Sequence, residues 1–240
     1  MKPDKEMQAY LTGAAFSSGC RFFIKEDKNR LDRISWLEDL CRNKKVIHVG
    51  CVDHNMETIE RKRQHGLWLH ERLVQSASLC LGIDTHREGI LYLREKLGDR
   101  NAVSCDLEKD ECQEIMQGQW DYLLMPEVLE HVDNPVAFLK AVREKFMGRV
   151  SRLVVTVPNA FRLINFRAAF QNHECINSDH RYWFTPYTLA KVLVRAGYNI
   201  ESLLFLEDAV YQRKGLRGVL RRYFLSKRPL FREVLGVLAS

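Results

Sequence analysis

The sequence lacks the features that mark several large classes of protein. It contains no apolar run that approaches the roughly 18–20 residues of a membrane-spanning helix. Its first sixteen residues are too polar for the apolar core of a secretory signal and show no clear cleavage site. We therefore expect a cytoplasmic protein without a membrane span.

A cysteine framework is also missing. The seven cysteines are an odd number, and no two of them are spaced as a Cys-x-x-Cys pair. This spacing indicates neither a set of disulfides nor a zinc site, and it fits a reducing compartment. No other metal constellation is apparent, so we expect no metal centre.

The charge of the chain is unevenly distributed. The formal net charge is +6, but residues 211–240 hold eight Lys or Arg residues against one Glu, so the rest is nearly neutral. Nucleic-acid-binding proteins usually present a basic face. Because the body of this chain has none, we do not expect a nucleic acid as its partner.

From residue 44 onward, short apolar runs alternate with amphipathic stretches. The runs lie at 46–50, 79–84, 102–106, 121–125 and 152–158, and the helical stretches near 66–77, 86–97, 109–117 and 134–147. This alternation predicts an α/β fold, with a Rossmann-like, doubly wound and mainly parallel sheet that carries helices on both faces. A helix at 186–196 and a strand at 199–206 follow. The pattern leaves open whether a seventh, antiparallel strand exists. We divide the chain into a helical cover (1–43), a main domain (44–208) and a basic amphipathic extension (209–240).

Unusual residues stand where the predicted strands end. Gly50 follows the first strand, where a glycine lets the backbone turn tightly and approach a ligand. Asp84 ends the second strand, and an acid there can accept hydrogen bonds from both hydroxyls of a ribose. Asp106 and Leu107 follow the third strand, where a carboxylate and a backbone amide suit an adenine edge. The strand ends therefore predict a site for an adenosine-containing ligand.

The fourth strand leads into PEVLEHVDNP at 126–135, and VTVPNAF and DHRYWFTPYTLAKVLVRAGY follow later in the chain. In this order, and after the glycine turn and the strand-end acids, these motifs resemble the class I S-adenosylmethionine-dependent methyltransferases of the small-molecule "methyltransferase domain" type. The resemblance covers roughly residues 44–206. It looks like a branch associated with bacterial surface-polysaccharide and lipid-linked sugar pathways.

The resemblance implies S-adenosyl-L-methionine as the cofactor and S-adenosyl-L-homocysteine as its product. It assigns cofactor contacts to Val49, Gly50, Cys51, Asp84, Asp106, Leu107, Met125 and Glu127. His131 and His180 would face the acceptor, and an imidazole suits a general base near neutral pH. The implied reaction is O-methylation of a sugar, a lipid-linked sugar or another small acceptor by in-line transfer. Glu130 is expected to be a solvated helix residue.

The first loop departs from the family pattern Asp-x-Gly-x-Gly-x-Gly. His48 stands in place of the acid, Val52 in place of the second glycine and His54 in place of the third. A β-branched residue at positive φ is costly, so this loop must turn differently. The departure leaves a non-catalytic relative open as an alternative. A nicotinamide-dependent oxidoreductase is a weaker alternative, because the loop has no G-x-G-x-x-G.

The basic extension contains an apolar stripe at helical spacing, formed by Leu216, Val219, Leu220, Tyr223 and Phe224. Two interpretations stay open. The helix either rests on an anionic membrane surface, at the inner face of the membrane, or packs on the sheet or a second subunit with its arginines in solvent. An oligomer is compatible with the second interpretation.

Overall fold

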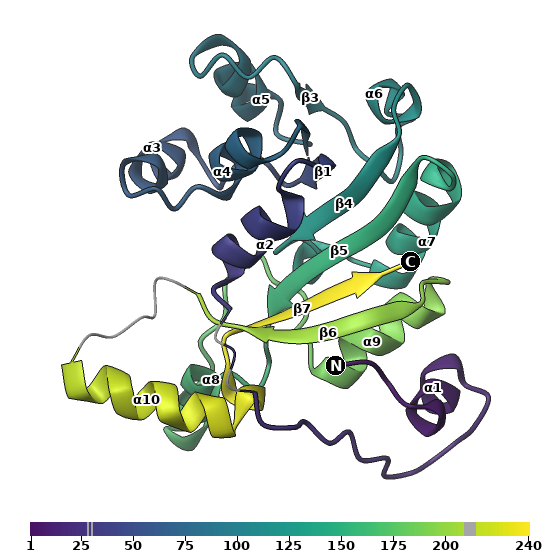
Figure 1. The fold of residues 1–240 in the computed structure, drawn as a ribbon, viewed down its shortest axis with the longest axis vertical. Helices are drawn as coiled ribbons and strands as arrows, with labels where there is room; N and C mark the ends of the chain where they lie inside the picture. The colour runs from purple at the N-terminus through teal and green to yellow at the C-terminus, as the bar shows by residue number, and fades with distance from the viewer. Residues whose placement is uncertain (28, 30, 209–214) are drawn as a thin grey trace. The chain divides into compact units, whose positions relative to one another are not determined.

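The computed structural model describes residues 1–27, 29, 31–208 and 215–240 (Figure 1). Its sheet has seven strands in the order β3-β2-β1-β4-β5-β7-β6. The strands are β1 (Lys45–Val49), β2 (Leu79–Asp84), β3 (Ala102–Ser104), β4 (Trp120–Pro126), β5 (Val150–Pro158), β6 (Ile200–Leu206) and β7 (Val234–Ala239). The predicted Rossmann-like α/β fold is confirmed. Every apolar run of the sequence pattern forms a strand within a few residues of its predicted bounds.

The chain divides into two compact units, and the first to consider comprises Ile34–Val128 and Lys140–Val155. In it, β1 pairs in parallel with β2 and β4, and β2 pairs in parallel with β3. The helices between these strands are α3 (Met56–Gln64), α4 (Leu69–Ser76), α5 (Arg87–Glu95) and α6 (Gln113–Met116). The apolar faces of α3 and α5 share a core with residues at the strand ends, built around Cys51, Ile59, Trp68, Ile90, Leu93 and Ala102.

The other unit comprises Met1–Arg33, Leu129–Leu139 and Thr156–Ser240. Here α1 (Lys5–Thr12) packs against α9 (Pro186–Arg195), and β6 pairs antiparallel with β7 (Figure 1). Pro186 at the first turn of α9 and a reciprocal Thr185–Thr188 cap explain why that helix begins there. The unit also holds η1 (Leu129–His131), α8 (Leu163–Phe170), α10 (Gly215–Lys227) and η3 (Pro229–Phe231). Helices α2 (Arg33–Cys41) and α7 (Pro135–Phe146), and strand β5, contribute residues to both units.

Residues 234–239 form a strand of the sheet. The sequence analysis instead placed them in an extension, 209–240, that follows the main domain. Strand β7 lies between β5 and β6 in the strand order, and Leu235, Val237 and Ala239 are fully buried. Just before it, the buried guanidinium of Arg232 donates to the Phe205 carbonyl at 2.9 Å and to Asp27 at 2.8 Å. The open question of a seventh, antiparallel strand is therefore answered by residues 234–239.

Helix α10 presents its apolar stripe to solvent. The stripe residues Leu216, Val219, Leu220, Tyr223 and Phe224 are 40–74% exposed, and only Gly218 and Leu225 of the helix are buried. Arg221 instead contacts the buried carboxylates of Glu207 and Glu233. The interpretation that the stripe packs on the sheet with its arginines in solvent is therefore wrong for the described residues. None of the helices in those residues is long and apolar enough to cross a membrane.

Candidate active site

The backbone after β1 makes the turn that the sequence predicted. Gly50 has φ +76°, and a Cβ there would lie 3.1 Å from a methyl carbon of Val128. Its N–H donates to the Ile83 carbonyl at 2.8 Å, which holds the turn beside the end of β2. Position 50 therefore needs glycine for two reasons, a left-handed backbone and a close approach.

Val52 is accommodated without a left-handed backbone. Among the described residues, only Asn43, Glu127 and Asn172 have positive φ without being glycine. The Val52 side chain packs on the apolar core, where it occupies the space beside Gly89 of α5. A Cβ on Gly89 would lie 2.3 Å from Cγ1 of Val52, so the glycine on the helix makes room for the valine in the loop. The loop therefore avoids the left-handed backbone that would be costly for a β-branched residue at position 52.

Asp84 ties two loops together at the end of β2. One carboxylate oxygen accepts from the Val52 N–H at 2.9 Å, and the other accepts from the His86 N–H at 3.0 Å. Each carboxylate oxygen has two acceptor positions, so both retain capacity for a ligand hydroxyl. The side chain is only partly buried, which leaves it accessible.

His48 takes part in a buried hydrogen-bonded chain. Its Nδ1 lies 3.0 Å from Nδ1 of His70, whose Nε2 lies 2.7 Å from a carboxylate oxygen of Asp99. Burial opposes ionisation of Asp99, but the bond to His70 holds the pKa of Asp99 below its ordinary value. A carboxylate from the loop before β3 is thus linked through His70 to the position where the family pattern has an acid. His70 and Trp68 are both buried.

The loop after β3 holds Asp106 and Leu107. Lys109 pairs with the Asp106 carboxylate at 2.9 Å, and the Glu108 N–H donates to it at 3.0 Å. Burial opposes ionisation, but these donors hold the pKa of Asp106 below its ordinary value. Lys145 of α7 donates to the carbonyls of Leu107, Glu108 and Asp110 at 2.7–3.2 Å, which fixes the loop conformation.

The remaining predicted cofactor residues lie at the ends of β1 and β4. Val49 and Met125 are buried strand residues, and Cys51 is buried in the core with the pKa of its thiol raised well above the usual range, chiefly by burial. Any contact of Cys51 with a cofactor therefore involves its backbone. Glu127 has φ +56°, a conformation that costs of order 1–3 kcal/mol in a residue other than glycine and that clusters at active sites and ligand clamps.

The two predicted acceptor-side histidines come together although 49 positions separate them. The rings of His131 and His180 are perpendicular, with centroids 4.6 Å apart. Nδ1 of His131 lies 2.8 Å from a carboxylate oxygen of Asp179, and Nε2 of His180 lies 4.0 Å from Oε1 of Glu130. The expectation that Glu130 is solvated is wrong, because its side chain is fully buried. The sequence feature that could have indicated a role for Glu130 in the site is its position next to His131 in the PEVLEHVDNP motif.

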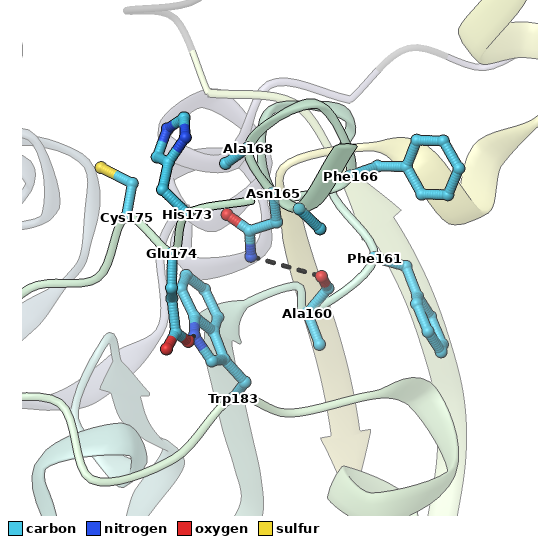
Figure 2. A pocket seen from close by; sticks show the side chains of 10 residues that line it. Ala160, Phe161, Asn165, Phe166, Ala168, His173, Glu174, Cys175 and Trp183 are labelled. Atoms are coloured by element: carbon cyan, nitrogen blue, oxygen red, sulfur yellow. Dashed lines mark hydrogen bonds between the residues drawn. The ribbon is translucent and has the colours of Figure 1, made fainter. Parts of the chain in front are cut away.

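A pocket of about 330 Å³ lies near this cluster in the same unit, between α8 and residues 173–183. Figure 2 shows the indole of Trp183 beside Glu174, and the amide of Asn165 turned toward the Ala160 carbonyl. The ring centroids of Trp183 and His180 are 6.2 Å apart, and the indole N–H of Trp183 donates to a carboxylate oxygen of Glu174 at 2.7 Å. The walls therefore combine aromatic surface with a carboxylate, an amide and an imidazole, the last from His173.

The fold, with its positive-φ glycine after β1 and its acid at the end of β2, defines a class I S-adenosylmethionine-dependent methyltransferase. The chain belongs to the methyltransferase-domain family, whose sequence model matches residues 25–203. S-adenosylmethionine is accordingly its cofactor, and the nicotinamide alternative falls away. No curated protein sequence matches the chain.

Solved structures resemble the chain at low sequence identity, and the first two that follow, with TM-scores above 0.5, share its fold. The small RNA methyltransferase HEN1 is 15% identical, with 92% of this chain and 26% of that chain covered and a TM-score of 0.57. The methyltransferase domain of bacterial CtHen1-CN is 18% identical, covers 86% and 94%, and has a TM-score of 0.51. Magnesium protoporphyrin IX methyltransferase from Synechocystis, with bound S-adenosylhomocysteine, is 16% identical over 86% and 78%, with a TM-score of 0.48.

Proposed function

We propose that the protein transfers the methyl group of S-adenosylmethionine to a hydroxyl of a sugar, a lipid-linked sugar or another small acceptor. The observation that carries this proposal is the pocket beside His180. Pockets for small ligands pair apolar and aromatic walls with a few polar groups, and a pocket of about 330 Å³ lies within their usual range. The indole of Trp183 offers a flat apolar face for a sugar ring, and Glu174 and Asn165 offer partners for its hydroxyls.

We assign the cofactor to residues at the strand ends of the unit that comprises Ile34–Val128 and Lys140–Val155. In this assignment, Asp84 accepts from the ribose hydroxyls, and Asp106 with Leu107 contacts the adenine. Val49, Gly50 and Cys51 line the methionine side, with Met125 and Glu127 beside the sulfonium. Asp84 fixes the backbone of the loop after β1, and Lys145 fixes the backbone of the loop after β3. Loops that are already fixed lose little freedom when a ligand binds, which supports this assignment.

The reaction needs alignment and removal of one proton. The acceptor oxygen attacks the methyl carbon in line with the sulfur–carbon bond, whose electron pair passes to sulfur and leaves a neutral thioether. A base must take the hydroxyl proton as the carbon–oxygen bond forms. His131 and His180 are the candidates, and Asp179 orients the ring of His131.

Replacing Asp84 with alanine tests the cofactor assignment. We expect S-adenosylhomocysteine to bind about 1–3 kcal/mol more weakly, because its ribose hydroxyls lose their acceptor. Isothermal titration calorimetry measures this change. The matched control is Asp39→Ala, which removes an exposed carboxylate of α2. Unchanged affinity in Asp84→Ala, with its thermal unfolding also unchanged, would show that Asp84 does not hold the ribose.

The degenerate glycine loop favours one alternative, a non-catalytic relative that binds the cofactor or only a partner protein. A relative that binds the cofactor would differ from the enzyme in turnover alone, whereas one that binds only a partner protein would also fail to bind S-adenosylhomocysteine. The packing of Val52 against Gly89 gives the altered loop a defined position, which supports cofactor binding.

We also propose that α8 and α10 place the protein against an anionic membrane surface, where a lipid-linked acceptor would be found. Phe231 joins the two helices, with ring centroids 5.9 Å from Phe166 and 5.6 Å from Phe224. Phe166 and Phe170 of α8 are 60% and 85% exposed, and they add to the exposed stripe of α10. Exposed aromatic and aliphatic side chains beside arginines are typical of helices that lie in the headgroup region. The cytoplasmic location expected from the sequence stays a prediction.

Vesicle sedimentation tests the membrane proposal. The protein should sediment with phosphatidylglycerol-containing vesicles at low salt, and less at high salt or with phosphatidylcholine alone. The double variant Leu220→Glu, Phe224→Glu should lose this binding, whereas Leu91→Glu on the exposed face of α5 should retain it. Self-association of the wild type without vesicles, abolished by the same double variant, would identify the surface as a subunit interface instead.

A further inference from the structure

Glu130, His131 and His180, hereafter the Glu130 cluster, gather the side-chain groups that bind divalent metal ions. One ligand atom from each residue lies within 4.8 Å of the other two. Glu130 is fully buried, and the side chain of His180 is 11% exposed. One carboxylate and two imidazoles form a ligand set that suits Zn²⁺ and other divalent transition metals.

The spacing within the cluster leaves room for an ion. Oε1 of Glu130 and Nε2 of His180 are 4.0 Å apart, longer than a direct hydrogen bond. Ligand atoms at about 2.0–2.2 Å from a shared ion lie roughly 3–3.5 Å from one another. Side-chain adjustments of about 1 Å or less would therefore bring the three ligand atoms onto one ion.

The residues around the cluster resemble the outer shell of a metal site. A histidine that binds a metal usually donates its second ring N–H to a carboxylate, which fixes its tautomer and orientation. Asp179 supplies that carboxylate to Nδ1 of His131 at 2.8 Å, so Nε2 is the nitrogen left for coordination.

The segment that carries His180 is held against the η1 region by several bonds. The Arg181 N–H donates to the Glu130 carbonyl at 2.7 Å, and the Tyr182 hydroxyl donates to the Asp133 carbonyl at 2.6 Å. The guanidinium of Arg181 also pairs with the Asp133 carboxylate. Ligands from two distant parts of the sequence are thus held in one geometry, as a preorganised site requires.

We propose that the Glu130 cluster binds one divalent transition-metal ion, such as Zn²⁺ or Mn²⁺, and that the ion holds the acceptor hydroxyl for methylation. This inference rests on the proposed function and assigns the two histidines as ligands in place of bases. Three protein ligands leave positions for the acceptor oxygen. The metal-bound hydroxyl loses its proton to water, and its oxygen then attacks the methyl carbon while the sulfur–carbon electron pair passes to sulfur.

Equilibrium dialysis of the full chain, stripped with a chelator and then exposed to ZnCl₂ or MnCl₂, tests the site by elemental analysis. The wild type should bind one ion per chain. Glu130→Gln and His180→Ala should weaken binding at least tenfold, and Asp179→Asn about 10–100-fold. His65→Ala, which removes an exposed histidine at the end of α3, should bind like the wild type.

Two outcomes would overturn the inference: a wild type that binds no ion, or equal binding by the wild type and both ligand variants. Circular dichroism confirms that each variant is folded, and His180→Ala decides the matter if Glu130→Gln does not fold. Calorimetry with S-adenosylhomocysteine on the stripped protein separates this failure from failure of the proposed function. Cofactor binding without metal binding overturns only the metal site, whereas metal binding without cofactor binding overturns the methyltransferase assignment.

Discussion

The variant His131→Ala is expected to lose roughly 10²–10⁴-fold in kcat while its affinity for S-adenosylhomocysteine stays at the wild-type value. Nδ1 of His131 lies 2.8 Å from a carboxylate oxygen of Asp179, which orients the imidazole. The substitution therefore removes an oriented group from the proposed acceptor side. Because the cofactor contacts are assigned to other residues, the dissociation constant should not change. Single-turnover kinetics with labelled cofactor measures the rate, and calorimetry measures the affinity.

The control for this prediction is His65→Ala, which should retain full turnover because this exposed ring bonds to the Arg61 carbonyl of its own helix. His180→Ala should show a loss of the same kind, since its ring packs against that of His131. Wild-type turnover in both His131→Ala and His180→Ala would mean that neither histidine takes part in the reaction. Reduced turnover with an equal loss of cofactor affinity would point to a structural role.

A chain that ends at Asp208 is expected to lose cooperative folding. The truncation removes β7, whose buried valine and leucine side chains each contribute about 1.5–3 kcal/mol, and Leu235, Val237 and Ala239 leave fully buried positions. Domains of this kind are stable by only about 5–15 kcal/mol, so this loss removes most of the stability. β6 would also lose its partner over Ile200–Leu206. Thermal unfolding followed by circular dichroism is the measurement.

The matched control removes α10 but keeps β7. A short Gly/Ser linker replaces residues 209–227, and Glu207→Gln and Glu233→Gln neutralise the two acids that lose Arg221. Burial already raises the pKa of Glu233, which makes the amide a mild replacement. Leu206 and Val234 are register partners, so the linker leads out of β6 and back, through residues 228–233, into the neighbouring strand β7. This version should unfold cooperatively. A cooperative transition in the chain ending at Asp208 would show that β7 is dispensable.

The fold, and the positions of Gly50 and Asp84 at the strand ends, were predictable because they depend on local patterns. Apolar runs that alternate with amphipathic helices define a parallel sheet, and in such a sheet the residues after each strand meet at one edge. Gly50 and Asp84 could therefore be placed from their positions after two apolar runs. The positive φ of Gly50 and the loop contacts of Asp84 agree with that reasoning.

Features that depend on contacts between distant segments could not be predicted in this way. Val52 looks costly by itself, and only its packing against Gly89 of α5 explains how the loop accommodates it. Glu130 follows an apolar residue on a polar-looking segment, and its burial depends on the return of residues 179–182. The run at 234–239 is short, and its place beside β6 is a long-range pairing.

Methyl transfer from labelled S-adenosylmethionine tests the central claim most directly. The purified protein, supplied with S-adenosylmethionine, is incubated with cell extract and with purified glycans, and the products are separated and read by mass spectrometry. We predict label in a glycan or other small-molecule fraction, with the mass of one added CH₂ group and one S-adenosylhomocysteine formed per methyl transferred. Protein that binds S-adenosylhomocysteine while all label stays in S-adenosylmethionine would contradict the claim and identify a non-catalytic relative.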